Sequence, residues 1–90
     1  MDKNKLHEIV DKLDNISDEL YKGNIDIGIA EIGLVIGDMN CILAEVSEEE
    51  REVFIEEGLK PLLEAMEKRD AVYMADIIKY EFVERIRNLS

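Results

Sequence analysis

The spacing of apolar residues limits the folds open to this chain more than any other feature of its sequence. In residues 2–22, apolar side chains recur every three or four positions, which is the period of one face of an α-helix. These side chains are Leu6, Ile9, Val10, Leu13, Ile16 and Leu20. The same spacing returns in and just after residues 71–88, at Ala75, Ile78, Phe82, Ile86 and Leu89. The pattern predicts an amphipathic helix near each end of the chain.

Short connections with capping residues separate the predicted helices. Gly23 is expected to end the first helix in a left-handed conformation, and Asn24 is expected to cap the second. Ser47 and Glu50 form a capping box, S-x-x-E, at the start of the third helix. Asp70 is expected to cap the last helix. These residues place three turns along the chain, and therefore four helices.

The third helix has a predicted irregularity in its middle. Its apolar face is Ile55, Leu59, Leu62, Leu63 and Met66. Because proline lacks an N–H and crowds the carbonyl four residues before it, we expect this helix to be kinked or broken near Gly58–Pro61. Four helices joined by short turns predict an all-α fold, a small antiparallel four-helix bundle that forms a single domain over residues 1–90.

The second helix, predicted over residues 25–45, is apolar on more than one side. One stripe is apolar throughout: Ile25, Ile29, Ile32, Ile36, Met39, Leu43 and Val46. The opposite stripe mixes apolar and acidic residues: Ile27, Glu31, Leu34, Asp38, Cys41 and Glu45. A helix that is apolar nearly all round is normally buried. We therefore expect it to be the central helix of the bundle or to contact another chain. A strand over residues 25–37 is the alternative, but the chain offers no second strand to pair with it.

The net negative charge of the chain argues against some classes of partner. With 22 acidic and 11 basic residues, its formal charge is −11. A protein that binds nucleic acid or an anionic membrane needs clustered Lys and Arg side chains, so neither is predicted as a partner. The excess lies mostly in residues 23–57, which hold ten acids and a single base, Arg51. This segment is either an acidic docking face for a basic partner or a solvated face with capping acids at a helix start.

Cysteine and histidine are too few for most metal or nucleophile chemistry. Cys41 is the only cysteine, which favours a reducing, cytoplasmic setting. Within an apolar helix it is expected to be a semi-buried, unreactive thiol. His7, the only histidine, is expected on the charged side of the first helix.

The N-terminal residues lack the apolar core of a signal peptide. The most apolar run, residues 27–36, is shorter than the roughly 20 residues of a membrane span. No cofactor is predicted.

One pattern resembles a catalytic site. Glu49-x-x-Glu52 is followed, after 14 residues, by Glu67-x-x-Asp70. This resembles the ExxE…ExxD motif of the all-helical MazG-like nucleotide pyrophosphohydrolases. The resemblance implies four carboxylates on facing helices that hold magnesium against the phosphates of a nucleotide. Two features depart from the motif: Glu67 and Asp70 fall at a predicted helix junction, and Pro61 lies between the two pairs.

A second resemblance covers residues 64–81. From Asp70 onward, the sequence matches D-x-V-x-x-A-D-I-x-x-Y-E, with Asp76, Tyr80 and Glu81 near its end. This pattern is similar to one in small all-helical bacterial proteins for which no activity is known. The resemblance therefore implies a helical fold and no particular chemistry. Asp76 and Tyr80 are four residues apart and share one helix face.

These features favour a non-enzymatic protein-interaction module, an adaptor or a chaperone-like bundle. The predicted interaction residues are Ile27, Glu31, Leu34, Asp38 and Cys41. The partner is another protein or, through the second helix, a second copy of the chain in a homodimer. Export chaperones of flagellar and secretion systems are also small acidic helical bundles, a likeness of class only. The alternative is a magnesium-dependent, pyrophosphohydrolase-like enzyme that uses the four carboxylates named above.

Overall fold

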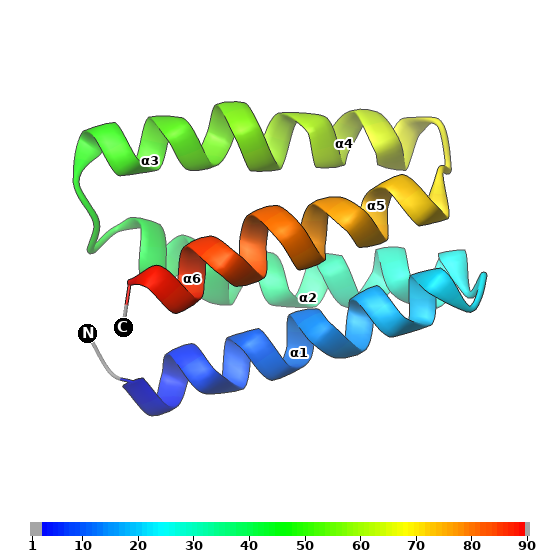
Figure 1. Cartoon of the computed structure of the whole chain (residues 1–90), viewed down its shortest axis with the longest axis horizontal. Helices are drawn as coiled ribbons and strands as arrows, with labels where there is room; N and C mark the ends of the chain where they lie inside the picture. The colour runs from blue at the N-terminus through cyan, green and yellow to red at the C-terminus, as the bar shows by residue number, and fades with distance from the viewer. Residues whose placement is uncertain (1–2, 90) are drawn as a thin grey trace.

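Four antiparallel helices make up the part of the chain that the computed structural model describes, residues 3–89 (Figure 1). The first two are α1, Lys3–Tyr21, and α2, Ile25–Leu43. The third consists of α3, Glu48–Phe54, a π-helical turn over Ile55–Leu59, and α4, Lys60–Glu67. The fourth consists of α5, Ala71–Ile77, a π-helical segment over Ile78–Val83, and α6, Glu84–Asn88. The predicted bundle is confirmed, whereas the expected helix start at Asp2 lies outside the described residues.

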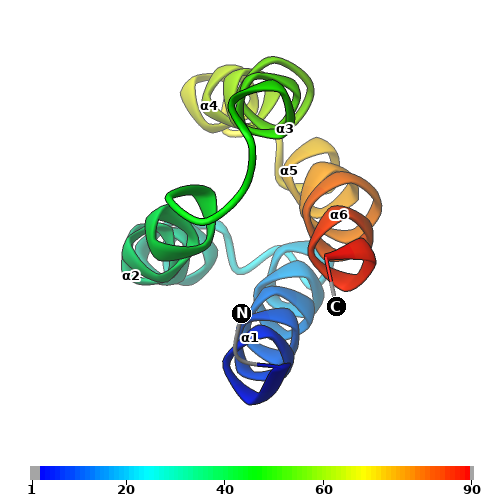
Figure 2. The same cartoon turned by 90° about the vertical axis from the view of Figure 1, so that its left-hand side faces the viewer.

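The helices follow one another around the bundle in chain order, as the end-on view in Figure 2 shows. α1 packs against α2 on one side and against α5 and α6 on the other, and α4 packs against α5. α2 makes few contacts with the third helix, so it is held in the bundle mainly by α1. One cluster of buried apolar side chains draws residues from all four helices.

The first and last helices bury the faces that their spacing predicts. All six apolar residues predicted for α1 are buried, and so are Ala75, Ile78, Phe82 and Ile86 of the fourth helix. Ser17 is also buried, and its hydroxyl donates to the carbonyl oxygen of Ala75 at 3.2 Å. This hydrogen bond satisfies the one buried polar side chain among the described residues and links α1 to α5.

Two of the predicted caps are present as expected. The hydroxyl oxygen of Ser47 accepts a hydrogen bond from the backbone N–H of Glu50 at 3.2 Å. The carboxylate of Asp70 accepts one from the backbone N–H of Tyr73 at 3.1 Å. Each satisfies a donor that the first turn of a helix leaves without an intrahelical partner. These caps fix where α3 and α5 begin.

Left-handed residues end α1 and α4. Gly23 has a φ of 87°, as predicted, and Arg69 has a φ of 52° although it is not a glycine. The guanidinium of Arg69 pairs with Asp26 at 2.6 Å. The prediction that Asn24 caps α2 is wrong. Its backbone is not in the extended conformation of a capping residue, and its amide donates instead to Glu19 at 2.7 Å.

The irregularity predicted near Gly58–Pro61 takes the form of a π-helical turn. The N–H of Lys60, directly before Pro61, donates to the carbonyl of Ile55, five residues back. A wider turn at this point accommodates a residue that has no N–H to donate, so the helix continues into α4.

The buried face of the third helix differs from the predicted one. Phe54, Gly58 and Leu62 are buried, whereas Leu63, which the spacing assigns to the core, is 49% exposed. Gly58 is needed here because a Cβ at this position would lie 2.5 Å from Cε1 of Phe82. The rings of Phe82 and Phe54 stack with centroids 5.0 Å apart. The two π-helical segments therefore pack against each other at this contact.

Candidate functional site

The predicted interaction residues lie on the side of α2 that faces away from the bundle or at the edge of that side next to α1. They are Ile27, Glu31, Leu34, Asp38 and Cys41. Leu34 is 80% exposed and Ile27 is 54% exposed, and Cys41 is exposed as well. Glu31 and Asp38 are half-buried at the edge next to α1, where Asp38 pairs with Lys12 at 3.1 Å. We call the exposed apolar and small residues of this side the outer face of α2: Ile27, Ala30, Gly33, Leu34, Gly37 and Cys41; exposed Asp26 and Asn40 border it.

Nothing in residues 3–89 covers this face. A Cβ added at Gly33 or Gly37 would meet no atom within 4 Å. The sequence predicts that α2 is either the central helix of the bundle or a helix that contacts another chain. The first of these predictions is wrong, because the inner side of α2, with buried Ile32 and Met39, faces the core and its outer face is open. The expectation of a semi-buried Cys41 is wrong for the same reason, because this residue lies on the open side.

The negative charge of residues 23–57 is only partly neutralised by basic side chains. Four of its acids have basic partners: Asp26 with Arg69, Asp38 with Lys12, Glu56 with Lys60, and Glu57 with Arg85. Among residues 3–89, no basic side chain pairs with the other six: Glu31, Glu45, Glu48, Glu49, Glu50 and Glu52. Arg51 donates to the backbone carbonyl of Leu43 at 2.9 Å instead. Uncompensated negative charge therefore collects where α2 ends and α3 begins.

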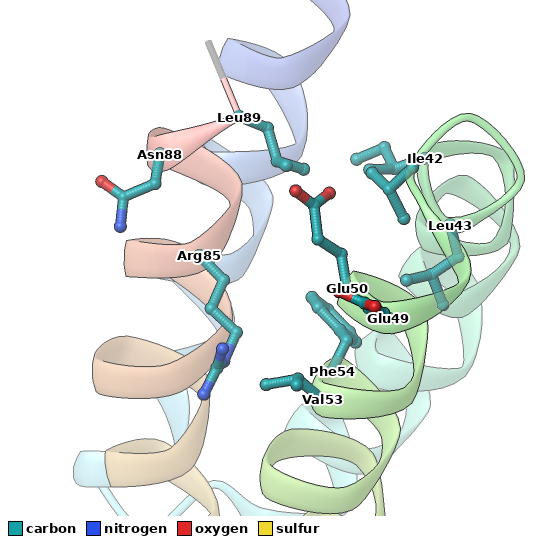
Figure 3. Close-up of a pocket in the computed structure, with 10 residues that line it drawn as sticks. Ile42, Leu43, Glu49, Glu50, Val53, Phe54, Arg85, Asn88 and Leu89 are labelled. Carbon is teal, nitrogen blue, oxygen red and sulfur yellow. The ribbon is translucent and has the colours of Figure 1, made fainter.

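An open pocket of about 380 Å³ lies at the same end of the bundle, between the end of α2, the start of α3 and the end of α6 (Figure 3). Its apolar lining consists of Ile42, Leu43, Val46, Val53, Phe54 and Leu89. Glu49, Glu50, Arg85 and Asn88 supply the polar lining. Arg85 is held by Glu81 at 3.1 Å and by a second ion pair with Glu57. Sequence periodicity does not predict this pocket, because its walls come from three segments that no periodicity relates to one another.

Tyr21, the last residue of α1, links this helix to α5. The hydroxyl of Tyr21 donates to the carboxylate of Asp76, and the ammonium of Lys79 lies 5.9 Å from the ring centroids of Tyr21 and Tyr80. The hydrogen bond to Asp76 raises the pKa of Tyr21 to about 12, with smaller contributions from desolvation and from the negative charge of Asp76. Tyr21 therefore stays protonated at a higher pH than an ordinary tyrosine, and its hydroxyl connects the two helices.

The four carboxylates of the pyrophosphohydrolase-like pattern do not come together. Glu52 lies near the start of the third helix, and Glu49 lies one turn before it, whereas Glu67 is the last residue of α4. A rise of about 1.5 Å per residue separates Glu52 from Glu67 by about 22 Å. Asp70 caps α5 instead. In the described part of the chain, no group of three or more His, Cys, Asp or Glu side chains is placed to hold a metal ion.

Comparison with known proteins gives one match. A family model described as a domain of unknown function (DUF8042) matches residues 3–90. The chain belongs to this family. Neither the curated proteins nor the solved structures contain a match to this DUF8042 chain. The predicted resemblance is confirmed in two respects: the chain belongs to a family of unknown function, DUF8042, and its described residues form helices.

One further property of the DUF8042 chain follows from the lengths and compositions of its helices. No helix among residues 3–89 is both long and apolar enough to cross a membrane. Three features of the described residues are candidates for a function: the outer face of α2, the glutamates without a basic partner in residues 3–89, and the open pocket.

Proposed function

We propose that this DUF8042 chain is a non-enzymatic protein-interaction module, an adaptor or a chaperone-like protein that acts in the cytoplasm. Its contact surface in this proposal is the outer face of α2. The observation that carries the proposal is Leu34, a large apolar side chain that is 80% exposed in the middle of a helix face on which no residue of the described chain packs. Contiguous exposed apolar residues of this kind are typical of protein interaction sites.

The shape of this face suits a partner helix. Ile27, Leu34 and Cys41 are seven residues apart, so they lie along one line of α2, as the contact residues of paired helices do. Gly33 and Gly37 flank Leu34 and carry no side chain that would hold a partner away. The distance between two packed helices depends on the side chains at their contact, so a partner could approach α2 closely here.

The negative charge of the chain favours a partner with basic residues. Glu31 lies at the edge of the outer face and has no basic partner among the described residues. A second copy of the chain would bring the same negative charge, at −11 per chain. We therefore propose a different protein, with apolar residues along one helix and Lys or Arg beside them, since opposite charges favour the encounter and like charges oppose it. Homodimerisation is the competing outcome in the test below.

Cys41 allows a direct test, because it is the only cysteine in the chain and lies on the proposed contact face. A photoreactive maleimide attached to Cys41 should, on illumination in an extract of the source cells, form an adduct with one protein of different sequence. Leu34→Glu should remove this adduct while changing the free energy of unfolding by no more than about 0.5 kcal/mol, since the site is exposed.

The matched control is Leu63→Glu, which alters a leucine that is 49% exposed on the third helix. This variant should retain the Cys41 adduct. The proposal is wrong if the adduct survives Leu34→Glu, if no adduct forms, or if the labelled chain cross-links only to a second copy of itself and sedimentation shows a dimer.

A further inference from the structure

We propose that the pocket at the end of the bundle is a second binding site, which accepts a large apolar side chain from a partner peptide whose neighbouring residues are Lys or Arg. The site lies between α2, α3 and α6 (Figure 3). It is separate from the outer face of α2 and does not depend on a partner binding there.

The apolar part of the pocket is graded from floor to rim. Ile42 and Phe54 are buried and form the floor, Val46 and Leu89 are half-buried, and Val53 is 40% exposed. The volume of about 380 Å³ is near the lower end of the range for ligand sites, about 300–1,000 Å³. A pocket of this size takes one or two side chains rather than a whole folded element. Filling it would remove the exposed apolar surface of Val53 from water.

The polar part of the pocket carries net negative charge. Among the described residues that line the pocket, Arg85 is the only cation, and its charge is already matched by the carboxylates of Glu57 and Glu81. Glu49 and Glu50 also line the pocket, and among residues 3–89 neither has a basic partner. An anionic amphiphile such as a fatty acid would therefore meet two carboxylates and no free cation. The lining favours an apolar group with positive charge beside it.

The extent of the negative charge favours a peptide over a small cationic amphiphile. Glu48, Glu49 and Glu50 lie in the first turn of α3, where acids also complement the helix dipole. Glu45 lies in the preceding turn and Glu52 in the next turn of the helix, outside that position, and both are unpaired in the described chain. A single cationic head group cannot neutralise carboxylates spread over this length. A peptide with several Lys or Arg residues along an amphipathic helix can do so.

The probe is a synthetic amphipathic peptide with leucines at helical spacing on one face and lysines on the other. We expect it to bind the full chain in isothermal titration calorimetry and to shift the methyl resonances of Leu43, Val53 and Leu89 in NMR spectra. Glu45→Gln/Glu49→Gln/Glu50→Gln should weaken binding about tenfold, because it removes three carboxylates while preserving side-chain shape. The matched control is Glu8→Gln/Glu64→Gln/Glu67→Gln, which changes the net charge equally at exposed sites away from the pocket and should bind within about twofold of wild type.

A second pair of variants tests the apolar contact. Val53→Asn should weaken peptide binding about tenfold. Leu63→Asn, at an exposed position of the same helix outside the pocket, should not. Urea unfolding of both variants shows whether either has lost its fold, and a peptide with serines in place of the leucines should not bind.

Three results would overturn the proposal. They are equal weakening by the two triple glutamine variants, methyl shifts confined to α1 and the outer face of α2, and equal or tighter binding of a peptide with glutamates in place of the lysines. Binding of dodecyltrimethylammonium at these methyl groups without any binding of the lysine peptide would assign the pocket to small amphiphiles and also refute it. Because the lysine peptide also has the chemistry proposed for the partner of α2, every titration is made on chains that carry Leu34→Glu, which removes the proposed contact on α2 and leaves the pocket intact. Peptide binding in this background then depends on the pocket alone, so this proposal and the proposed role of α2 can fail separately.

Discussion

Alanine substitutions at the glycines of α2 should change stability in opposite directions, according to which side of the helix each glycine occupies. Gly33 and Gly37 lie on the outer face, and a Cβ at either position meets no atom within 4 Å. Alanine is favoured over glycine inside a helix by about 0.8–1.0 kcal/mol. Gly33→Ala/Gly37→Ala should therefore raise the free energy of unfolding by about 1.5–2 kcal/mol, and Tm by roughly 6–16 °C.

Gly28 provides the internal control on the same helix. It is buried against α1, and a Cβ there would lie 2.8 Å from Cγ of Leu20, whose side chain is fully buried. The same gain in helix propensity is then set against an overpacking cost of about 1–3 kcal/mol. Gly28→Ala should lower the free energy of unfolding by up to about 2 kcal/mol.

Urea unfolding followed by far-ultraviolet circular dichroism measures both effects, with equal slopes indicating that all variants unfold to a similar extent. The reasoning is refuted if the double variant is no more stable than wild type, or if Gly28→Ala is stabilising. The double variant should also give less of the Cys41 adduct, because two methyl groups would hold a partner helix away from Leu34. A variant that is more stable yet binds its partner as well as wild type would remove the glycines from the proposed contact.

Three further predictions concern the links within the bundle. The raised pKa of Tyr21, about 12 in the folded chain against an ordinary value of 10, means that its hydrogen bond to Asp76 stabilises the fold fully below pH 10 and that this contribution is lost as the pH rises toward 12. The stability difference between wild type and Tyr21→Phe should therefore shrink across that window, and Asp76→Asn should bring the pKa of Tyr21 back toward 10 in a spectrophotometric titration; an unchanged titration would contradict this. Arg69→Gly should raise the free energy of unfolding by about 0.5–1 kcal/mol, because it relieves a left-handed non-glycine residue and gives up only an exposed ion pair; a loss of stability would show that the pair with Asp26 outweighs the backbone cost. Phe82→Ala should cost about 3–5 kcal/mol, a large part of the roughly 5–13 kcal/mol typical of a 90-residue chain, and a loss below about 1 kcal/mol would mean that the contact with Phe54 and Gly58 is not part of a tightly packed core.

The sequence predicts the helices of this bundle well where one apolar face decides the outcome. Leu6 through Leu20 in α1 have no alternative face to bury, so their spacing determines both the helix and its orientation toward the core. Ser47 and Asp70 are similarly decisive, because each side chain satisfies a backbone donor within its own turn. Local chemistry of this kind is complete within a few residues, and a single sequence contains all of it.

Prediction from spacing fails where a tertiary contact changes the helical period. Pro61 locates an irregularity, but spacing alone reveals neither that it takes the form of a π-helical turn nor that Leu63 lies outside the core. In the fourth helix neither glycine nor proline marks the π-helical segment over Ile78–Val83. That segment lies against the turn at Gly58, across which Phe82 and Phe54 stack. The pairing of two widened turns depends on both helices, so neither sequence segment predicts it alone.

The position of α2 shows why an apolar stripe alone does not distinguish a core from a contact surface. Gly33 and Gly37 together forgo about 1.5–2 kcal/mol of helix stability on a face that nothing covers among residues 3–89. Leu34 exposes its side chain between them and contributes little to the core. Within the bundle, neither choice brings a compensating contact. Docking of a partner helix on the outer face would turn both into interactions, since the glycines would admit its backbone and Leu34 would be buried. This is the physical reason to look for the function of the chain on the open side of α2 before its interior.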